Sequence, residues 1–145
     1  MFVGNLKETL NLGKTLSDKL NPQSIVLLKG PIGAGKTSFV QGIAKGLSIC
    51  EEITSPTFAL SHHYNSGKIP LIHLDLYRLE NTFSAKEFFY SEEEEALQNK
   101  AILVIEWPEL IEPVIDNFWK IEISYAKNYG RHYEIRDPKN LSTFL

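Results

Sequence analysis

The sequence predicts an α/β fold, built as one domain over residues 1–145 with a central, mostly parallel sheet flanked by helices. Short, wholly apolar runs alternate with segments of helical periodicity, which is typical of buried parallel strands covered by helices. The last part of the chain instead indicates late antiparallel strands. No internal repeat or low-complexity linker divides the sequence, so we expect a single domain.

The first third of the chain predicts two helices around one buried strand. Leucines at near-helical spacing begin at Leu6, and Asn21-Pro22 is expected to stop this first helix. Residues 25–28 are wholly apolar and begin with β-branched side chains, which indicates a buried strand. Residues 36–47 place apolar side chains on one helical face, so we expect a second helix there.

The middle of the chain predicts a hairpin. Alternation of residue type over residues 58–64 indicates a strand, and Asn65-Ser66-Gly67 is a favourable turn. Residues 71–76 are expected to form the partner strand.

The remaining elements are one helical region and three strands. Residues 85–98 predict helix in two short pieces, and residues 101–105 predict another buried strand. Residues 118–125 and 132–136 are expected to be late strands joined by a loop at Asn128-Tyr129-Gly130.

Composition excludes several classes of protein. Fifteen Lys and Arg against eighteen Asp and Glu give a net charge of -3, which excludes a strongly basic nucleic-acid coat and a polybasic membrane anchor. The single cysteine, Cys50, cannot form a disulfide within the chain and favours a reducing, cytoplasmic location. The apolar runs are far shorter than the roughly 20 residues that span a bilayer. Residues 1–5 lack the cationic region and apolar core of a signal peptide. We expect no membrane partner.

A glycine-rich segment carries the strongest functional signal. Residues 30–37 match the phosphate-binding pattern G-x-x-x-x-G-K-[ST] between a predicted buried strand and a predicted helix. Its backbone N–H groups and the helix N-terminus are suited to phosphate oxygens, its lysine to the β- and γ-phosphates, and its threonine to Mg²⁺. The expected fold class is therefore a P-loop NTPase. The nucleotide-binding residues expected here are Gly30, Pro31, Ile32, Gly33, Ala34, Gly35, Lys36, Thr37 and Ser38.

Two acids are candidates for the second Mg²⁺-linked group of such a site. Glu106 directly follows the apolar run 101–105, and Asp75 ends the run that begins at Leu71. Acids in this position are expected at the carboxyl edge of the sheet, where ligands bind. Which of the two acts more directly on the metal stays open. His73, on the same strand as Asp75, is interpreted as a core or sheet-face histidine.

The segment Ser55-Pro56-Thr57 lies between the P-loop helix and the next strand and has two interpretations. It is either a switch-like loop ordered by a γ-phosphate and its Mg²⁺, or an ordinary polar loop. The run Glu92-Glu93-Glu94-Glu95 likewise indicates either a solvated helical face or a partner-docking surface.

The nucleotide is expected to be ATP. The chain has only three arginines, which argues against a small-molecule kinase that clamps two anionic substrates. The guanine-reading pattern N-K-x-D is broken by Ile102, and a D-x-x-G switch is broken by Arg78, which argues against a GTPase.

Four blocks in series resemble one family, the bacterial TsaE (YjeE) ATPases. They are the P-loop, Ser55-Pro56-Thr57-Phe58, the stretch His73 to Leu79, and the stretch Ile105 to Glu109. The order and spacing match over about residues 6 to 136. The later blocks are much more specific than the P-loop, which many proteins share.

The resemblance implies a weak, Mg²⁺-dependent ATPase that takes part in the threonylcarbamoyl modification of the adenosine beside the tRNA anticodon. It implies action on the TsaD–TsaB pair, which transfers the threonylcarbamoyl group. We expect a monomer when the protein is alone. Because the chain is short and acidic, we expect it to reach tRNA only through these partners. A non-hydrolytic ATP-bound assembly factor and a small-molecule phosphotransferase are the alternatives.

The resemblance also implies roles for individual residues. Lys36, Asp75 and Glu106 are the expected catalytic residues: Lys36 holds phosphates, Asp75 lies by the γ-phosphate, and Glu106 binds Mg²⁺ together with Thr37. Ser55 and Thr57 would form the switch-like loop.

Further roles follow for residues outside these blocks. Trp107 would stack near the nucleotide or a partner, with simple rim packing as the alternative. Leu6 to Thr9 would lie against adenine, and Arg131 matches a late arginine with a nucleotide or partner role. Residues 81–98 depart from the acidic, glycine-containing segment of many members, which leaves the partner interface open.

Overall fold

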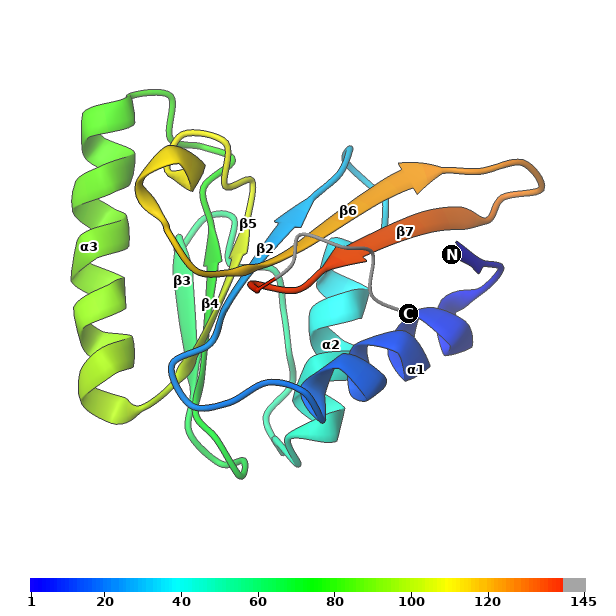
Figure 1. Ribbon diagram of the computed structural model, residues 1–145, viewed down its shortest axis with the longest axis horizontal. Coiled ribbons are helices and arrows are strands. Elements are labelled where there is room, and N and C mark those ends of the chain that lie inside the picture. The colour runs from blue at the N-terminus through cyan, green and yellow to red at the C-terminus, as the bar shows by residue number, and fades with distance from the viewer. Residues whose placement is uncertain (140–145) are drawn as a thin grey trace.

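A seven-stranded sheet in the order β1-β7-β6-β2-β5-β4-β3 runs through the computed structural model, which describes residues 1–139 (Figure 1). Strands β6, β2, β5 and β4 are parallel to one another, while β1, β7 and β3 pair antiparallel at the edges. The predicted α/β fold with a mostly parallel centre and late antiparallel strands is confirmed. The strands are β1 (Phe2–Val3), β2 (Ile25–Lys29), β3 (Ser61–Tyr64), β4 (Leu71–Asp75), β5 (Ile102–Glu106), β6 (Trp119–Tyr125) and β7 (Arg131–Arg136).

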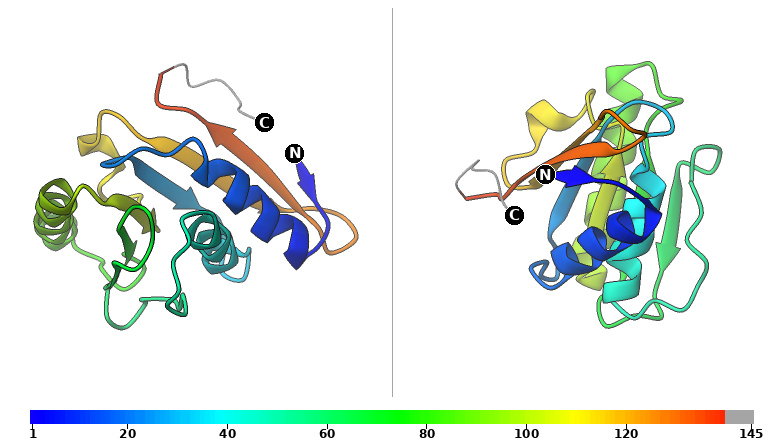
Figure 2. Two further views of the ribbon diagram at one scale, coloured as in Figure 1. Left: turned by 90° about the horizontal axis from the view of Figure 1, so that it is seen from below. Right: turned by 90° about the vertical axis from the view of Figure 1, so that its right-hand side faces the viewer.

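Helices cover the two faces of this sheet. They are α1 (Leu6–Ser17), α2 (Lys36–Gly46), α3 (Thr82–Asn99) and a 3-10 turn, η1 (Glu112–Val114). Apolar side chains of α1 and α2 pack with one set of strand residues, and those of α3 pack with the alternate set, as the period of two along a strand requires. Figures 1 and 2 show α1 and α2 next to each other, with α3 on the other side of β4 and β5.

Two helix boundaries differ from the sequence-based expectation. Helix α1 ends at Ser17, because tight bonds from Lys19 N–H to Leu16 and from Leu20 N–H to Ser17 turn the chain before Asn21-Pro22. Helix α3 is one continuous helix, so the expectation of two short pieces is wrong. Asn81 caps its first turn, Ala85, Phe89 and Ala96 form one buried stripe, and no glycine or proline interrupts it.

Two strands also differ from expectation. Strand β3 begins at Ser61, not at Phe58, because the chain turns at residues 57–60 and Leu60 has a φ of 67°. Strand β1 was not predicted, since two residues are too few for a periodic pattern; pairing with Arg131 and His132 of β7 defines it. Strands β4 and β5 end on Asp75 and Glu106, so both acids lie at the carboxyl edge of the sheet.

The contact between α1 and α2 depends on two glycines. A Cβ at Gly13 would lie 2.4 Å from the Phe39 carbonyl oxygen, and a Cβ at Gly42 would lie 2.4 Å from the Leu10 carbonyl oxygen. Only a residue without a side chain permits backbones to approach this closely. This close crossing brings the first turn of α1 beside α2 and the loop before it.

We expect Gly13→Ala to lower the free energy of unfolding by about 1–3 kcal/mol, because the added methyl forces the two helices apart. The loss should appear although alanine is the better helix former by about 1 kcal/mol. Urea unfolding measures it. Gly4→Ala is the matched control, because its Cβ would meet its nearest neighbour at 3.4 Å; an equal loss in both variants would contradict the packing explanation.

Candidate functional site

The glycine-rich loop joins the central strand β2 to helix α2 and adopts a backbone that favours glycine. Gly33 and Gly35 have φ values of 78° and 101°, a region that side chains with a Cβ rarely adopt. Gly35 precedes α2, and the first turn of α2 has neither a side-chain cap nor an acidic residue. The N–H groups and partial positive charge of this helix end are therefore available to an anion.

The ammonium group of Lys36 is folded against the loop that precedes it. It donates hydrogen bonds to the carbonyl oxygens of Gly30, at 2.6 Å, and Pro31, at 2.8 Å, and lies 4.3 Å from the centre of the Trp107 ring. Burial lowers the pKa of Lys36 below its ordinary value, while the carboxylates of Glu106, Asp75 and Glu109 oppose that change. The site thus holds a cation that is only partly solvated.

Asp75 and Glu106 face this loop as register partners on adjacent parallel strands. Each is 3% exposed, and each is the last residue of its strand. Asp75 accepts hydrogen bonds from the Thr57 hydroxyl, at 2.8 Å, and from the Tyr77 N–H, at 2.9 Å. Glu106 is bonded to His73, at 2.6 Å. The two strands therefore hold a pair of carboxylates in place.

The Ser55-Pro56-Thr57 segment reaches the same place. The hydroxyls of Ser55 and Thr57 lie 2.8 Å apart, and that of Thr57 also donates to Asp75. The segment is thereby attached to the end of β4, and the switch-like loop and the ordinary polar loop both stay open as interpretations.

A cavity of about 480 Å³ brings most of the expected residues together. Its lining combines the loop, the first turn of α2, both acids and the attached segment. It is formed by Ile32, Gly33, Gly35, Lys36, Thr37, Ser38, Ser55, Thr57, Asp75, Tyr77, Glu106 and Trp107. Gly30 and Pro31 line a separate cavity of about 550 Å³ that Trp107 borders as well.

The N-terminal segment lines a third, smaller cavity beside the loop. It measures about 240 Å³ and is formed by residues 3–6, Thr9, the loop residues 33–35, Ser38, Tyr129 and Arg131. Leu6 and Thr9 of the segment expected to lie against adenine line this cavity, and their contact with adenine stays a prediction.

Arg131, the first residue of β7, forms hydrogen bonds to the glycine-rich loop. Its guanidinium donates to the carbonyl oxygens of Ala34 and Gly33, each at 3.2 Å, and lies 4.6 Å from the centre of the Tyr125 ring. The Tyr125 hydroxyl in turn donates to the Ile32 carbonyl. The structure thus places Arg131 on the backbone of the loop.

Tyr77 and Tyr125 are site-related side chains to which the sequence assigned no role. The rings of Tyr77 and Trp107 lie 4.8 Å apart at the cavity, and Tyr125 reaches the loop from a strand far along the chain. His73 was expected in the core and is fully buried, but its bond to Glu106 was not expected. Tyr77 had a signal, since it follows Asp75 by two residues; the others depend on contacts between distant segments.

The acidic run on α3 is only partly a solvated face. Glu92 accepts hydrogen bonds from Ser61, at 3.0 Å, and is paired with His63, at 2.8 Å, so it joins α3 to β3. Burial raises the pKa of Glu93 above its ordinary value, whereas Glu94 and Glu95 are exposed.

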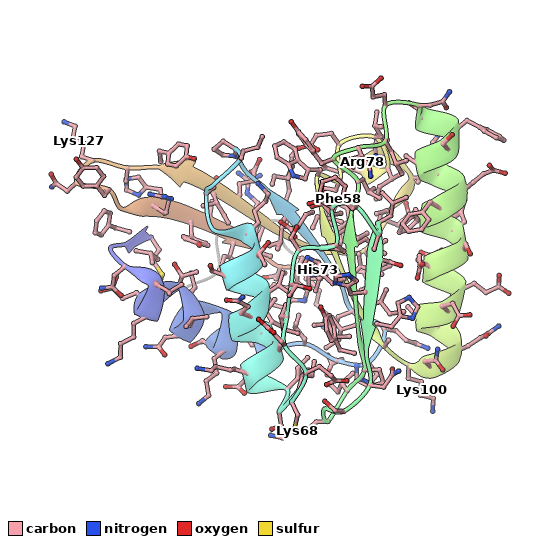
Figure 3. The ribbon with its side chains drawn as sticks, turned by 180° about the vertical axis from the view of Figure 1, so that it is seen from behind. Phe58, Lys68, His73, Arg78, Lys100 and Lys127 are labelled. Carbon is pink, nitrogen blue, oxygen red and sulfur yellow. The ribbon has the colours of Figure 1, made fainter. Side chains whose placement is uncertain are left out.

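Figure 3 shows Phe58 and Arg78 together near the ends of the strands, where the guanidinium of Arg78 lies 5.0 Å from the centre of the Phe58 ring.

Over residues 1–139, no helix is long and apolar enough to cross a membrane.

Fold and site together define an α/β protein in which a glycine-rich loop faces two strand-end carboxylates. The family model described as "Threonylcarbamoyl adenosine biosynthesis protein TsaE" matches residues 3–133. The crystal structure of Bacillus subtilis YdiB has a TM-score of 0.74 at 28% identity, covering 92% of this chain and 80% of that one.

Relatives that carry the same name are similar to this chain over most of its length. A "tRNA threonylcarbamoyladenosine biosynthesis protein TsaE" from Nostoc sp. is 42% identical over 137 residues, 93% of this chain and 83% of the relative. A protein of the same name from Synechocystis sp. is 46% identical over 110 residues, 74% of this chain and 69% of the relative. The chain belongs to the TsaE family.

We expect Arg131→Ala to loosen the loop without unfolding the protein, because it removes two donors from loop carbonyls. Hydrogen exchange at the amides of residues 33–35 should become faster, while exchange in β2 and β5 should stay unchanged. Lys127→Ala is the control, since Lys127 lies at the far tip of the same hairpin (Figure 3). Equal exchange in the parent and Arg131→Ala would show that the loop keeps its shape without this contact.

Proposed function

We propose that this protein is an ATPase that takes part in tRNA threonylcarbamoyladenosine biosynthesis. The names of its relatives support the pathway. One observation carries the chemistry: a phosphate-binding type of loop with a buried lysine opens into the same cavity as two buried strand-end carboxylates. This is the combination that phosphoryl transfer requires, because positioning and neutralisation of charge supply most of the catalysis.

The loop would hold the phosphates of ATP. The glycine-rich backbone and the first turn of α2 offer N–H groups, and the Ser38 side chain lies in that turn. Lys36 would exchange its bonds to the Gly30 and Pro31 carbonyls for phosphate oxygens, which are stronger acceptors because they are charged.

The oxygen donors at the cavity fit Mg²⁺. Thr37 supplies a hydroxyl and Glu106 a carboxylate, with Asp75 beside them, and Mg²⁺ is usually bound by one or two carboxylates together with phosphates. Within residues 1–139, no group of three or more His, Cys, Asp or Glu forms a metal site by itself. Bound there, the ion would neutralise charge that develops on the phosphates.

Asp75 would orient the attacking water. Its two oxygens already accept bonds from Thr57 and the Tyr77 N–H, which hold the carboxylate in one orientation. The water oxygen forms a bond to the γ-phosphorus while the bond to the bridging oxygen breaks, so ADP leaves with the electron pair and the water proton ends on phosphate or solvent.

We further propose TsaD–TsaB as the partner, with tRNA held by that pair. The net charge of -3 supports this division, because a protein that binds tRNA directly needs a basic surface. The single cysteine supports a reducing compartment, and we place the protein in the cytoplasm.

We expect Lys36→Ala and Glu106→Gln each to lower ATP turnover by about 10²–10³-fold. The first removes the positive charge that stabilises the phosphates in the transition state, and the second removes the negative charge of the carboxylate that would bind Mg²⁺. Phosphate release with Mg-ATP measures this, and circular dichroism checks the fold. Lys45→Ala is the matched control: the same change on the same helix, at its exposed far end. Normal turnover in either site variant would contradict the assignment of the site.

We expect TsaD–TsaB to stimulate a low basal ATPase activity, because a bound partner can hold the site in the arrangement that positions the phosphates and the attacking water. The measurement compares phosphate release with and without the pair, in the presence of tRNA. ATP that stays intact through one round of modification would favour the non-hydrolytic assembly factor. Transfer of the γ-phosphate to a small metabolite would favour the phosphotransferase.

A further inference from the structure

The sheet buries one histidine side chain completely, directly behind the expected metal ligand. His73 lies on β4, two residues before Asp75, and its Nε2 is 2.6 Å from Oε2 of Glu106 on β5. Because Asp75 is the register partner of Glu106, the hydrogen bond runs diagonally between neighbouring strands on one face of the sheet.

The surroundings of the ring determine which nitrogen donates. Nδ1 of His73 has no hydrogen-bond partner among the described residues. A proton on Nδ1 would leave a buried donor unpaired and turn the lone pair of Nε2 toward the carboxylate. A proton on Nε2 makes the bond to Glu106 and leaves only an acceptor unpaired, so His73 is the donor.

The bond to His73 makes the two carboxylate oxygens of Glu106 different from each other. Oε2 is held by His73, whereas Oε1 accepts no hydrogen bond from any residue between 1 and 139. The Glu106 side chain is 4% exposed and lines the 480 Å³ cavity. One oxygen is thus anchored inside the sheet, and Glu106 also lines the cavity, which leaves Oε1 as the oxygen available to a ligand there.

The geometry points to His73 as a positioning residue that holds Glu106 in the orientation required for Mg²⁺, an inference that rests on the proposed function. The partners that hold a ligating carboxylate typically contribute about 10–100-fold to metal affinity. Leu71, Ile102 and Val104 on the same face are all apolar. If His73 only filled space there, an apolar side chain would stabilise the sheet as well or better, which argues against a purely structural role.

The test measures how much Mg²⁺ is needed to strengthen binding of a fluorescent, non-hydrolysable ATP analogue. We expect His73→Leu and His73→Asn to raise the half-saturating Mg²⁺ concentration by about 10–100-fold, because neither places a donor next to Oε2. His73→Gln should remain close to the parent protein, because its amide N–H reaches the position of Nε2. Binding of the analogue without Mg²⁺ should be equal in all variants.

Two controls separate positioning from stability. Ile72→Ala removes a buried side chain of the same strand on the opposite, α3-facing side, and should lower stability without changing the Mg²⁺ requirement. When Glu106→Gln is already present, His73→Leu should add no further shift, because it acts through that carboxylate.

Each outcome supports or contradicts the positioning role of His73. If His73→Leu needs no more Mg²⁺ than the parent while Glu106→Gln does, His73 is structural only and the metal site stands. If Glu106→Gln itself changes nothing, the metal assignment fails and the role of His73 fails with it. If His73→Leu does not fold, the comparison of His73→Gln with His73→Asn decides, and equal Mg²⁺ requirements in these two variants overturn the inference.

Discussion

Two carboxylates held away from water at the ends of adjacent parallel strands are the constraint on which the site depends. A buried carboxylate is costly unless donors or cations surround it. Asp75 receives a side-chain and a backbone hydrogen bond, and Glu106 receives one from His73. The ammonium of Lys36 lies close enough for both carboxylates to act on its pKa. The strands, the segment 54–60 and the glycine-rich loop are thus joined through these two acids.

The loop is shaped by the rest of the molecule as well as by its glycines. The Lys36 ammonium and the Arg131 guanidinium both bind its carbonyl oxygens, and the Ala34 N–H donates to the Pro31 carbonyl oxygen within the loop. A loop whose backbone is already held in place loses less conformational entropy when an anion arrives, and the remaining change is that Lys36 leaves its two carbonyl partners. Trp107, whose φ is 57°, turns back at the end of β5 and places its ring over Lys36. The cation is therefore held between its own loop and an aromatic ring.

The sequence predicted the parts of the fold that have a local signal. The four central strands and helix α2 appear where apolar runs and helical periodicity indicate them. The expectations for α3, β3 and β1 were wrong or missing, because continuity of a helix, a turn at Leu60 and pairing of two residues depend on neighbours across the fold. Propensity is a weak guide where tertiary contacts decide.

The sequence by itself determined the chemistry available to this protein: a glycine-rich loop with Lys36 and Thr37, and an acid after each of two apolar runs. These signals are local, because a motif or a strand end is defined by adjacent residues. Only the tertiary structure decided that His73 holds Glu106 and that Arg131 holds the loop, 33 and 97 or 98 residues away along the chain. Sheet register and strand order create such contacts, and no periodic pattern within one segment encodes them.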